Sequence, residues 1–341
     1  MRGLRRIGHT LLIAICLAAS VCPAADYVTA AVCGECHKTE YDRQTASRHA
    51  HSLQPIQGSI ARTAMLRSAQ SPDGRLHYEA DGNKILVREP GVSEPVTIDW
   101  AFGAGAQGIT PVGHLAGQYF EHRFSYYSAE EKLGITFGHP PHVNTPLAEI
   151  GMPQDNRTIF RCFNCHSTGV RLSVNGPDLA GMEPGVRCER CHGPGSTHVM
   201  LARGGAPAEA IAREIVNPGR FPPKVQVEVC GECHRLPTRD MGDEPELENP
   251  VTVRFAPIGL SASRCFRASG KLSCLTCHDP HENASKESTS YTNRCLSCHE
   301  NDRRPVKLCR RLQTANCLPC HMKTVALGRH LRFTDHRIRV Y

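Results

Sequence analysis

The stretch Cys188-Glu-Arg-Cys191-His192 carries the pattern that decides the fold, Cys-x-x-Cys-His. The pattern occurs seven times in the 341 residues. The copies span residues 33–37, 162–166, 188–192, 230–234, 274–278, 295–299 and 317–321. At two cysteines per copy they use 14 of the 18 cysteines, whereas random placement would give about 0.05 copies. The repeat is therefore a built feature of the chain.

The spacing within each copy has a chemical reason. Two thiols three positions apart can each add to one vinyl group of a single porphyrin, and the next histidine then lies under the iron as its proximal ligand. The sequence therefore predicts seven covalently attached haem c groups. The predicted attachment residues are Cys33, Cys36, Cys162, Cys165, Cys188, Cys191, Cys230, Cys233, Cys274, Cys277, Cys295, Cys298, Cys317 and Cys320. The predicted proximal ligands are His37, His166, His192, His234, His278, His299 and His321.

Other uses of paired cysteines fit the pattern less well. Zinc ribbons need two pairs per ion and have no histidine directly after each pair. Iron–sulfur clusters need four cysteines per cluster in other spacings. A thioredoxin-like redox motif occurs once in its domain. Haem also accounts for the composition: only 6% of the residues are aromatic, with one Trp, so the porphyrins would supply apolar core that the chain lacks.

The N-terminus has the pattern of a secretory signal. Arg2, Arg5 and Arg6 precede an apolar run over residues 10–21, and small residues follow at positions 24 and 25. Removal of residues 1–24 is therefore predicted, with export to the periplasm; the alternative is an uncleaved N-terminal anchor. Three of the 40 basic residues would leave with this segment and none of the 33 acidic ones, which gives a net charge of +4. That balance is not typical of nucleic-acid binding.

A low-spin haem needs a second strong axial ligand, which must come from outside its own motif because the motif covers only one face of the ring. Eleven histidines remain after the proximal ones and His9. Proline or glycine breaks the chain shortly after two of the motifs, which could swing the next histidine toward a neighbouring haem. The predicted second ligands are His198, His281, His49 or His51, His139, His330 and His336.

The number of these candidates bears on function. If one of His49 and His51 is used, six second ligands serve seven haems. One haem could then be five-coordinate, with an open face for a small molecule.

The spacing of the motifs predicts the organisation of the chain. We expect a first haem segment over 25–69, a β-rich insertion over 70–138 and a six-haem region over 139–341. The insertion contains an expected hairpin of residues 76–80 and 85–88, and further expected strands over 96–102 and 118–127. The remainder should be short helices and loops, so the predicted fold class is mainly α and irregular, packed around haems, with a small β-rich insertion.

Two smaller features complete the interpretation. Gly103-Ala-Gly105-Ala-Gln-Gly108 matches a dinucleotide-binding pattern, but no helix signal follows and Pro111 comes soon after. We therefore expect a glycine-rich turn between strands. Cys265 and Cys309 lie outside every motif, and we expect them to form a disulfide in an oxidising compartment, the alternative being two separate thiols.

Several segments resemble one family of haem proteins. The matching stretches are Ser47-Arg-His-Ala-His51, residues 100–105, residues 185–198, residues 272–281, and Cys320-His-Met with Phe333-Thr-Asp-His336-Arg-Ile338. The chain is similar here to multihaem cytochromes related to the nitrifier tetrahaem cytochrome and the hydroxylamine-oxidoreductase lineage. The resemblance implies two histidine ligands at most haems, including His198, His281 and His336, and stacked haem pairs. No tyrosine matches the cross-linking residue of the hydroxylamine oxidoreductases, which argues against that activity.

These observations favour an exported protein that carries electrons. Adjacent haems would pass single electrons between other redox proteins of the periplasm or membrane. The alternative is an oxidoreductase whose one open haem acts on a small nitrogen or sulfur compound. A third possibility is a haem-bearing module that docks onto a larger complex.

Overall fold

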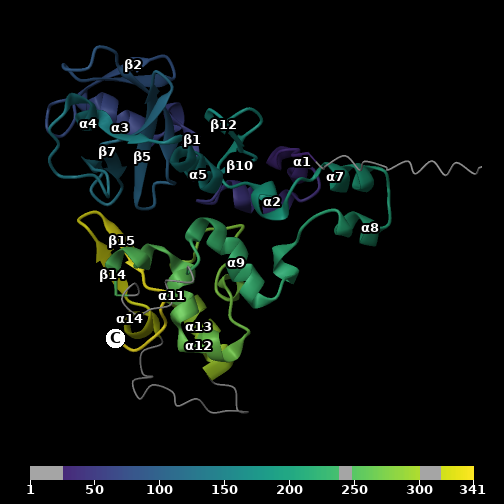
Figure 1. Ribbon diagram of the computed structural model, residues 1–341. Coiled ribbons are helices and arrows are strands. Elements are labelled where there is room, and N and C mark those ends of the chain that lie inside the picture. Colours follow the sequence, from purple (N-terminus) through teal and green to yellow (C-terminus); the bar gives the residue numbers. More distant parts are fainter. Residues whose placement is uncertain (1–25, 238–247, 300–315) are drawn as a thin grey trace, which may run out of the picture.

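The computed structural model describes residues 26–237, 248–299 and 316–341 (Figure 1). The predicted signal segment and Cys309, with its expected disulfide, lie outside these residues. In the described part of the chain, no helix is both long and apolar enough to span a membrane.

Within the described residues, nine antiparallel strands form one sheet. Its main path runs β2-β3-β4-β5-β6-β9, while β1 pairs with β4 and β7 pairs with β5 and β8. The strands are β1 (Leu53–Pro55), β2 (His77–Asp81), β3 (Lys84–Arg88), β4 (Val96–Phe102), β5 (Gly108–Leu115), β6 (Gln118–His122), β7 (Phe124–Tyr127), β8 (Lys132–Ile135) and β9 (Gly151–Gln154).

This sheet shows that the predicted fold class is wrong. The chain is not mainly α, and its β region is not a small insertion, because the sheet begins at Leu53 and ends at Gln154. β1 and β9 are too short to show a strand pattern, and they join the sheet only through distant partners. Leu53 pairs with Phe102, and Gly151 pairs with His122. The glycine-rich stretch after β4 is a turn between strands, as expected.

The sheet has its own hydrophobic core. Ile85 and Val87 on β3 and Ile98 on β4 are fully buried, as the alternation of strand side chains requires. Helix α3 (Ile60–Ser68) covers this face with Ala61 and Met65, and Ser59 caps its N-terminus, where the Ser59 side chain accepts from the Ala61 N–H. Burial of each such aliphatic side chain contributes roughly 1.5–3 kcal/mol to stability. The sheet region is therefore stabilised by its own side chains.

A second apolar cluster fastens the motif at 162–166 to the sheet. Helix α5 (Asn156–His166) contributes Ile159 and Phe163, which pack against Leu53, Phe102 and Val112. Asp155 caps the N-terminus of this helix, and its carboxylate accepts from the backbone N–H groups of residues 157 and 158 at 2.9 and 2.8 Å. The last residue of α5 is the motif histidine, so the sheet fixes the position of that side chain.

The other described helices are short, and five of them (α1, α6, α9, α13 and α14) contain motif residues. They are α1 (Ala30–Gly34), α2 (Lys38–Thr45), α4 (Pro146–Ile150), α6 (Cys188–His192), α7 (Ser196–Arg203), α8 (Ala208–Arg213), α9 (Pro223–His234), α11 (Ala256–Ala262), α12 (Arg264–Ser269), α13 (Ser288–His299) and α14 (Leu318–His321), with 3₁₀ turns η1 (Ile56–Gly58), η2 (Pro218–Arg220), η4 (Pro250–Arg254) and η5 (Cys274–Thr276). Three small two-stranded sheets pair β10 (Ser167–Thr168) with β13 (Glu183–Pro184), β11 (Arg171–Ser173) with β12 (Gly176–Asp178), and β14 (Thr324–Leu327) with β15 (Leu331–Thr334).

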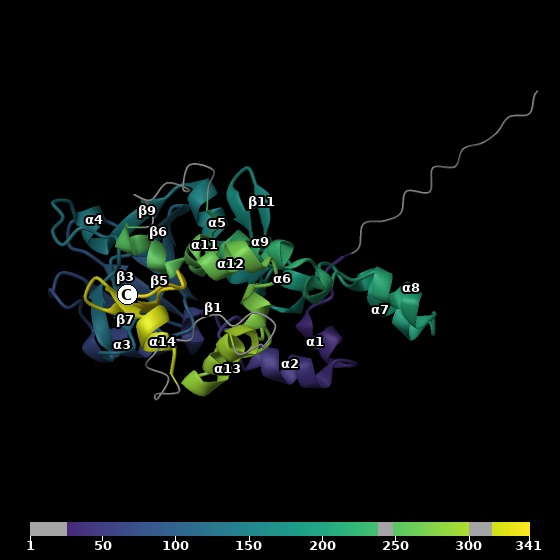
Figure 2. The same cartoon turned by 90° about the horizontal axis from the view of Figure 1, so that it is seen from below.

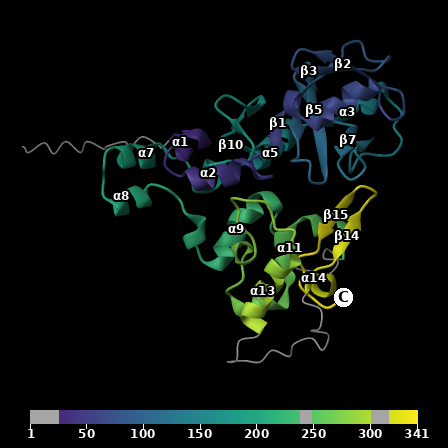
Figure 3. The same cartoon turned by 180° about the vertical axis from the view of Figure 1, so that it is seen from behind.

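The molecule has two lobes. One contains the large sheet with α5 and, beyond it, α1, α2 and α7, while the other contains α9 and α11 to α14 (Figures 1 and 3). α7 and α8 project from the first lobe as an arm (Figure 2). The β14–β15 hairpin reaches back to the sheet, where the side-chain amide of Gln107 donates to the Arg332 carbonyl and accepts from the Arg332 N–H, at 2.6 and 3.1 Å.

Candidate haem-attachment sites

Each motif is shaped by one tight turn of backbone. We number the seven motifs site 1 to site 7 in chain order. In sites 1, 5 and 7 the backbone N–H of the motif histidine donates to the carbonyl of the first motif cysteine, at 2.9, 3.0 and 3.1 Å. Helical spacing of this kind places the two cysteines on one side of the turn. The pentapeptide thus presents both thiols and one imidazole together.

Four motif histidines each face a histidine from a distant part of the chain. The ring centroids are 6.4 Å apart for His37 and His198, 6.2 Å for His192 and His281, 6.2 Å for His234 and His49, and 6.3 Å for His278 and His336. Each non-motif partner is one of the second ligands predicted from the sequence. Of the alternatives His49 and His51, the structure brings the first opposite a motif histidine.

This separation matches two imidazoles on opposite sides of one metal ion. Two bonds of about 2 Å, plus roughly 1.2 Å from each ring centre to its nitrogen, place the ring centres about 6.4 Å apart. Direct van der Waals contact would not require four unrelated pairs to share one spacing. The residues of sites 1, 3, 4 and 5 therefore fit a haem held between two histidines.

Hydrogen bonds on the other ring nitrogen fix the tautomer of most of these histidines. The Nδ1 atom of His198 lies 2.9 Å from the Ile211 carbonyl, and that of His192 lies 2.7 Å from the Val216 carbonyl. Since a carbonyl only accepts, Nδ1 carries the proton and the Nε2 lone pair is free for a metal. The same arrangement holds His49 on the Pro280 carbonyl at 3.2 Å, His336 on Thr334 at 2.9 Å and His166 on Ser52 at 2.9 Å.

Burial keeps several of these rings in the neutral form that binds metals. It lowers the pKa of His234 to about 4, with further lowering by the neighbouring histidines, His49 first among them. Burial also lowers the pKa of His166, although its hydrogen bond to Ser52 opposes the shift. Neutral imidazole is the ligating form.

Sites 2, 6 and 7 are different. Among the described residues, no histidine from outside the motifs faces His166, His299 or His321. The ring of His166 instead packs edge-on against Phe102, with centroids 5.3 Å apart.

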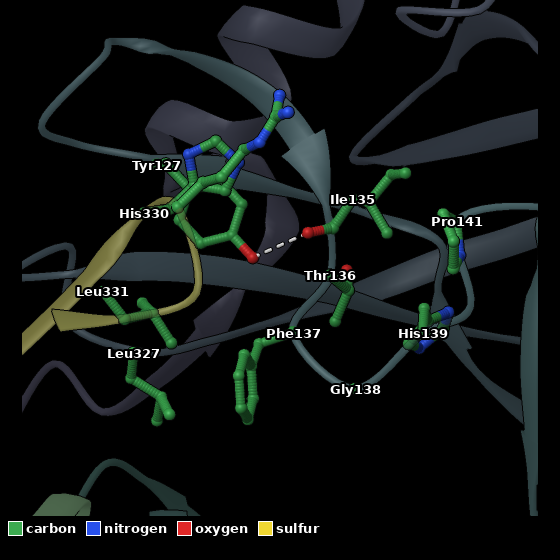
Figure 4. A pocket seen from close by; sticks show the side chains of 11 residues that line it. Tyr127, Ile135, Thr136, Phe137, Gly138, His139, Pro141, Leu327, His330 and Leu331 are labelled. Carbon is green, nitrogen blue, oxygen red and sulfur yellow. Dashed lines mark hydrogen bonds between the residues drawn. The ribbon is translucent and has the colours of Figure 1, made fainter. Parts of the chain in front are cut away.

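Three predicted second ligands lie away from all motif histidines in the part of the chain that the structure describes. His139 Nε2 is 3.3 Å from a Glu121 carboxylate oxygen, and His330 Nδ1 is 3.0 Å from one of Glu130. His330 also stacks on Tyr127, with centroids 4.2 Å apart. Both histidines line a cavity of about 240 Å³ between the sheet and the β14–β15 hairpin (Figure 4). His51 is exposed.

Cysteines of different motifs lie against each other. The thiols are within hydrogen-bonding reach between Cys33 and Cys188, Cys165 and Cys233, Cys230 and Cys274, and Cys295 and Cys317. These contacts join site 1 to site 3, site 2 to site 4, site 4 to site 5 and site 6 to site 7. Because the cysteines bind the porphyrin edge, such contacts bring the edges of two porphyrins together.

Weaker contacts connect these groups of sites. Arg190 of site 3 donates to the Cys233 sulfur of site 4 at 3.7 Å. The ring of His278 in site 5 packs edge-on against Tyr291, with centroids 5.6 Å apart, and Tyr291 lies on α13, which ends at the site 6 histidine. The motifs therefore form one continuous series in the order of sites 1, 3, 4, 5, 6 and 7. Site 2 joins this series at site 4.

One loop, residues 278–283, organises three neighbouring sites. His278 belongs to site 5, the Pro280 carbonyl orients His49 of site 4, and His281 faces the motif histidine of site 3. The segment 43–49 holds this loop: Arg43 pairs with Asp279 and Glu282, and the residue 48 N–H donates to the Asn283 side chain. Sequence reasoning missed these supporting residues, because only the distant contact gives them a role.

Comparisons with known proteins agree with the motif pattern. Residues 142–193, which contain sites 2 and 3, match the family model "Cytochrome c554 and c-prime". The structure resembles that of the outer cell wall cytochrome OcwA, with a TM-score of 0.55 and 15% identity over 92% of this chain and 79% of that one. The undecaheme cytochrome from the S-layer of Carboxydothermus ferrireducens gives a TM-score of 0.42 and 15% identity over 81% of this chain and 43% of that one.

No curated protein sequence gave a significant match. The family match covers two motifs, and the likeness to the cell-wall cytochrome shows a shared fold. Together with the motif geometry, they support a multihaem c-type cytochrome with covalently attached haem c that functions in electron transfer.

Proposed function

We propose that this protein is a seven-haem electron conduit that is exported to the periplasm and passes electrons between redox proteins there or at the membrane. The observation that carries the proposal is the continuous series of motif contacts from site 1 to site 7. We also propose that its relatives are the nitrifier tetrahaem cytochrome and the hydroxylamine-oxidoreductase lineage, a placement supported by the segments around sites 1, 3 and 5.

The bound haem c would supply one-electron redox chemistry between a reduced donor protein and an oxidised acceptor protein. The chain positions the groups. Motif cysteines hold neighbouring porphyrin edges close, and tunnelling between cofactors slows steeply with distance. Paired histidines such as His192 and His281 would hold a haem in the same way in both oxidation states, so little reorganisation would accompany each transfer.

The haem count is tested by the intact mass of the exported protein. Seven haems would add about 4.3 kDa to the chain (seven times about 616 Da). A pyridine haemochrome assay on the same sample should give the same number. A protein that carries zinc instead, or fewer than seven haems, contradicts the proposal.

The order of the sites is tested on an electrode. The C-terminal Tyr341 lies at site 7, where its N–H donates to the Cys320 carbonyl at 3.3 Å. A film tethered through the C-terminus should therefore exchange electrons through site 7 first. In wild-type protein, voltammetry should address every haem.

A variant without the site 4 haem, Cys230→Ala with Cys233→Ala, should leave only sites 5 to 7 addressed at fast scan rates. The matched control removes the terminal site 1 haem by Cys33→Ala with Cys36→Ala, and it should lose one haem only. Equal losses in the two variants would contradict the proposed series.

A second candidate function is an oxidoreductase that acts on a small nitrogen or sulfur compound at an open haem. The observation that favours it is the lack of a facing histidine at His166 among the described residues. High-spin haem by electron paramagnetic resonance, with nitric oxide binding that displaces no ligand, would favour this candidate. Purely low-spin haem would exclude it.

A further inference from the structure

The His192–His281 pair at site 3 differs from the other pairs in how its distant histidine is oriented. His198, His49 and His336 each place Nδ1 against a backbone carbonyl. His281 places Nδ1 against a carboxylate, 2.9 Å from Asp279 Oδ1. Of the paired histidines in the described structure, this one alone has an anionic acceptor.

Asp279 is held in place by several contacts. Its Oδ1 also accepts from the His281 backbone N–H at 2.9 Å, and its Oδ2 accepts from Arg43 at 2.8 Å. Arg43 bonds Glu282 as well, at 2.7 Å. The carboxylate therefore has partners on both oxygens and points one of them at the imidazole.

Asp279 therefore faces His281 as a hydrogen-bond acceptor and Arg43 as an ion-pair partner. About a third of the side chain is exposed, so solvent screens part of its charge.

A carboxylate acceptor changes the electronic character of a ligating imidazole. It draws the Nδ1 proton toward itself and so raises the basicity of Nε2. A more basic ligand stabilises the oxidised metal more than the reduced metal, which lowers the reduction potential. A neutral carbonyl acceptor has a smaller effect of the same kind.

We propose that Asp279 is a positioning residue that gives site 3 the lowest reduction potential of the four histidine-paired sites, and that Arg43 limits this effect. The inference rests on the proposed function, in which His192 and His281 share one haem. Site 3 contacts sites 1 and 4. Its reduction potential therefore sets the free-energy change of electron transfer from each of these two sites to site 3.

The test is a redox titration of the haem-loaded protein, followed site by site through the low-spin electron paramagnetic resonance signals. In Asp279→Asn, the reduced-to-oxidised ratio of one haem at a fixed potential should rise about tenfold, equal to about 59 mV for one electron. Arg43→Gln should shift the same haem in the opposite direction, by at least threefold. Asp279→Glu keeps a carboxylate, so the reduced-to-oxidised ratio of this haem should return toward the wild-type value.

The matched control is Glu282→Gln, which removes a carboxylate that binds the same arginine but touches no histidine. In this variant the reduced-to-oxidised ratio of the same haem should change by less than twofold. Equal shifts in Glu282→Gln and Asp279→Asn would overturn the inference, as would a shift in the same direction for Arg43→Gln and Asp279→Asn.

A further variant separates this inference from the proposed function. His281→Ala should convert one low-spin haem to high spin. If it does not, His281 is not a ligand and the proposed pairing fails. The other outcome is that His281→Ala gives the expected high-spin haem while neither Asp279→Asn nor Arg43→Gln changes the reduced-to-oxidised ratio of any haem by more than twofold. In that case only the inference about Asp279 is overturned.

Discussion

The sheet region, residues 53–166, and the motif-rich region, residues 167–341, are held together in different ways. Both apolar clusters have their buried members between Leu53 and Phe163. In the described part of 167–341, the buried apolar side chains are only Val227, Pro257, Ile258, Leu260 and Leu327. The first region builds its own core, whereas we propose that the second depends on haem for most of its apolar interior.

Polar contacts replace part of the missing core in the motif-rich region. The buried carboxylate of Glu189, between the two cysteines of site 3, accepts from the backbone N–H groups of Val28, Thr29 and Gly195 at 2.8–2.9 Å. It thereby anchors the start of the described chain to site 3. Such contacts fix a position but bury little apolar surface.

The largest expected effect comes from withholding haem. Protein made without haem attachment should keep slow amide exchange in β3, β4 and β5, because their core is made of side chains. Residues 167–341 should exchange at nearly unfolded rates. Hydrogen exchange followed by mass spectrometry measures both regions in one sample. Slow amide exchange in α9 and α11 without haem would contradict the proposed dependence of this region on haem.

Truncation of the sheet core should be costly whether or not haem is present. Ile98 is fully buried within the larger cluster, so Ile98→Ala should lower the free energy of unfolding of the sheet by about 2–5 kcal/mol. Amide exchange in β3 to β5 reports the loss. Ile258→Ala, which is equally buried but belongs to neither cluster, is the control and should affect exchange only around α11.

Glu189→Gln tests the polar anchoring of the motif-rich region. Loss of the charge weakens three hydrogen bonds at a side chain that is only 3% exposed, so we expect a cost of about 1.5–3 kcal/mol. Faster exchange and proteolysis at residues 26–30 measure it. Glu183→Gln is the control: in the described structure its carboxylate accepts one backbone hydrogen bond, from the Ala30 N–H, and lies 4.0 Å from Arg187, and an equal effect there would contradict the role of Glu189.

His122 should make the sheet region sensitive to acid. Its ring is buried, with Nε2 3.1 Å from the Tyr78 hydroxyl, and burial lowers its pKa from 6.5 to about 3. Below pH 6.5 the unfolded chain takes up a proton that the folded chain does not. The stability contribution is therefore complete above pH 6.5 and is lost as the pH falls.

Between pH 6.5 and pH 5 this loss amounts to about 2 kcal/mol, at 1.36 kcal/mol per pH unit. Amide exchange measures the free energy of unfolding of β4 to β6. In His122→Gln this free energy should fall by about 2 kcal/mol less than in wild type between pH 6.5 and pH 5. An unchanged slope would show that His122 does not control the acid response.

The sequence predicted the β2–β3 hairpin, β4, and a strand over 118–127 that the structure divides into β6 and β7. It also predicted the four distant histidines that face motif histidines, but not the rest of the sheet or which histidines face each other. Residues 96–102 and 85–88 alternate visibly, because each face of a strand meets a different environment. β1 and β9 carry no such signal, since their pairing with β4 and β6 is made across the chain. The positions of His139 and His330 near glutamates likewise depend on how the hairpin packs on the sheet.

The sequence alone determined the haem-attachment chemistry, because a Cys-x-x-Cys-His pentapeptide is complete within one turn of backbone. Only the tertiary structure decided which distant histidine meets which motif and which cysteines lie side by side. His49 reaches His234, and Cys33 reaches Cys188, across more than 150 residues. Such contacts depend on how the whole chain closes on itself, and no local pattern encodes that closure.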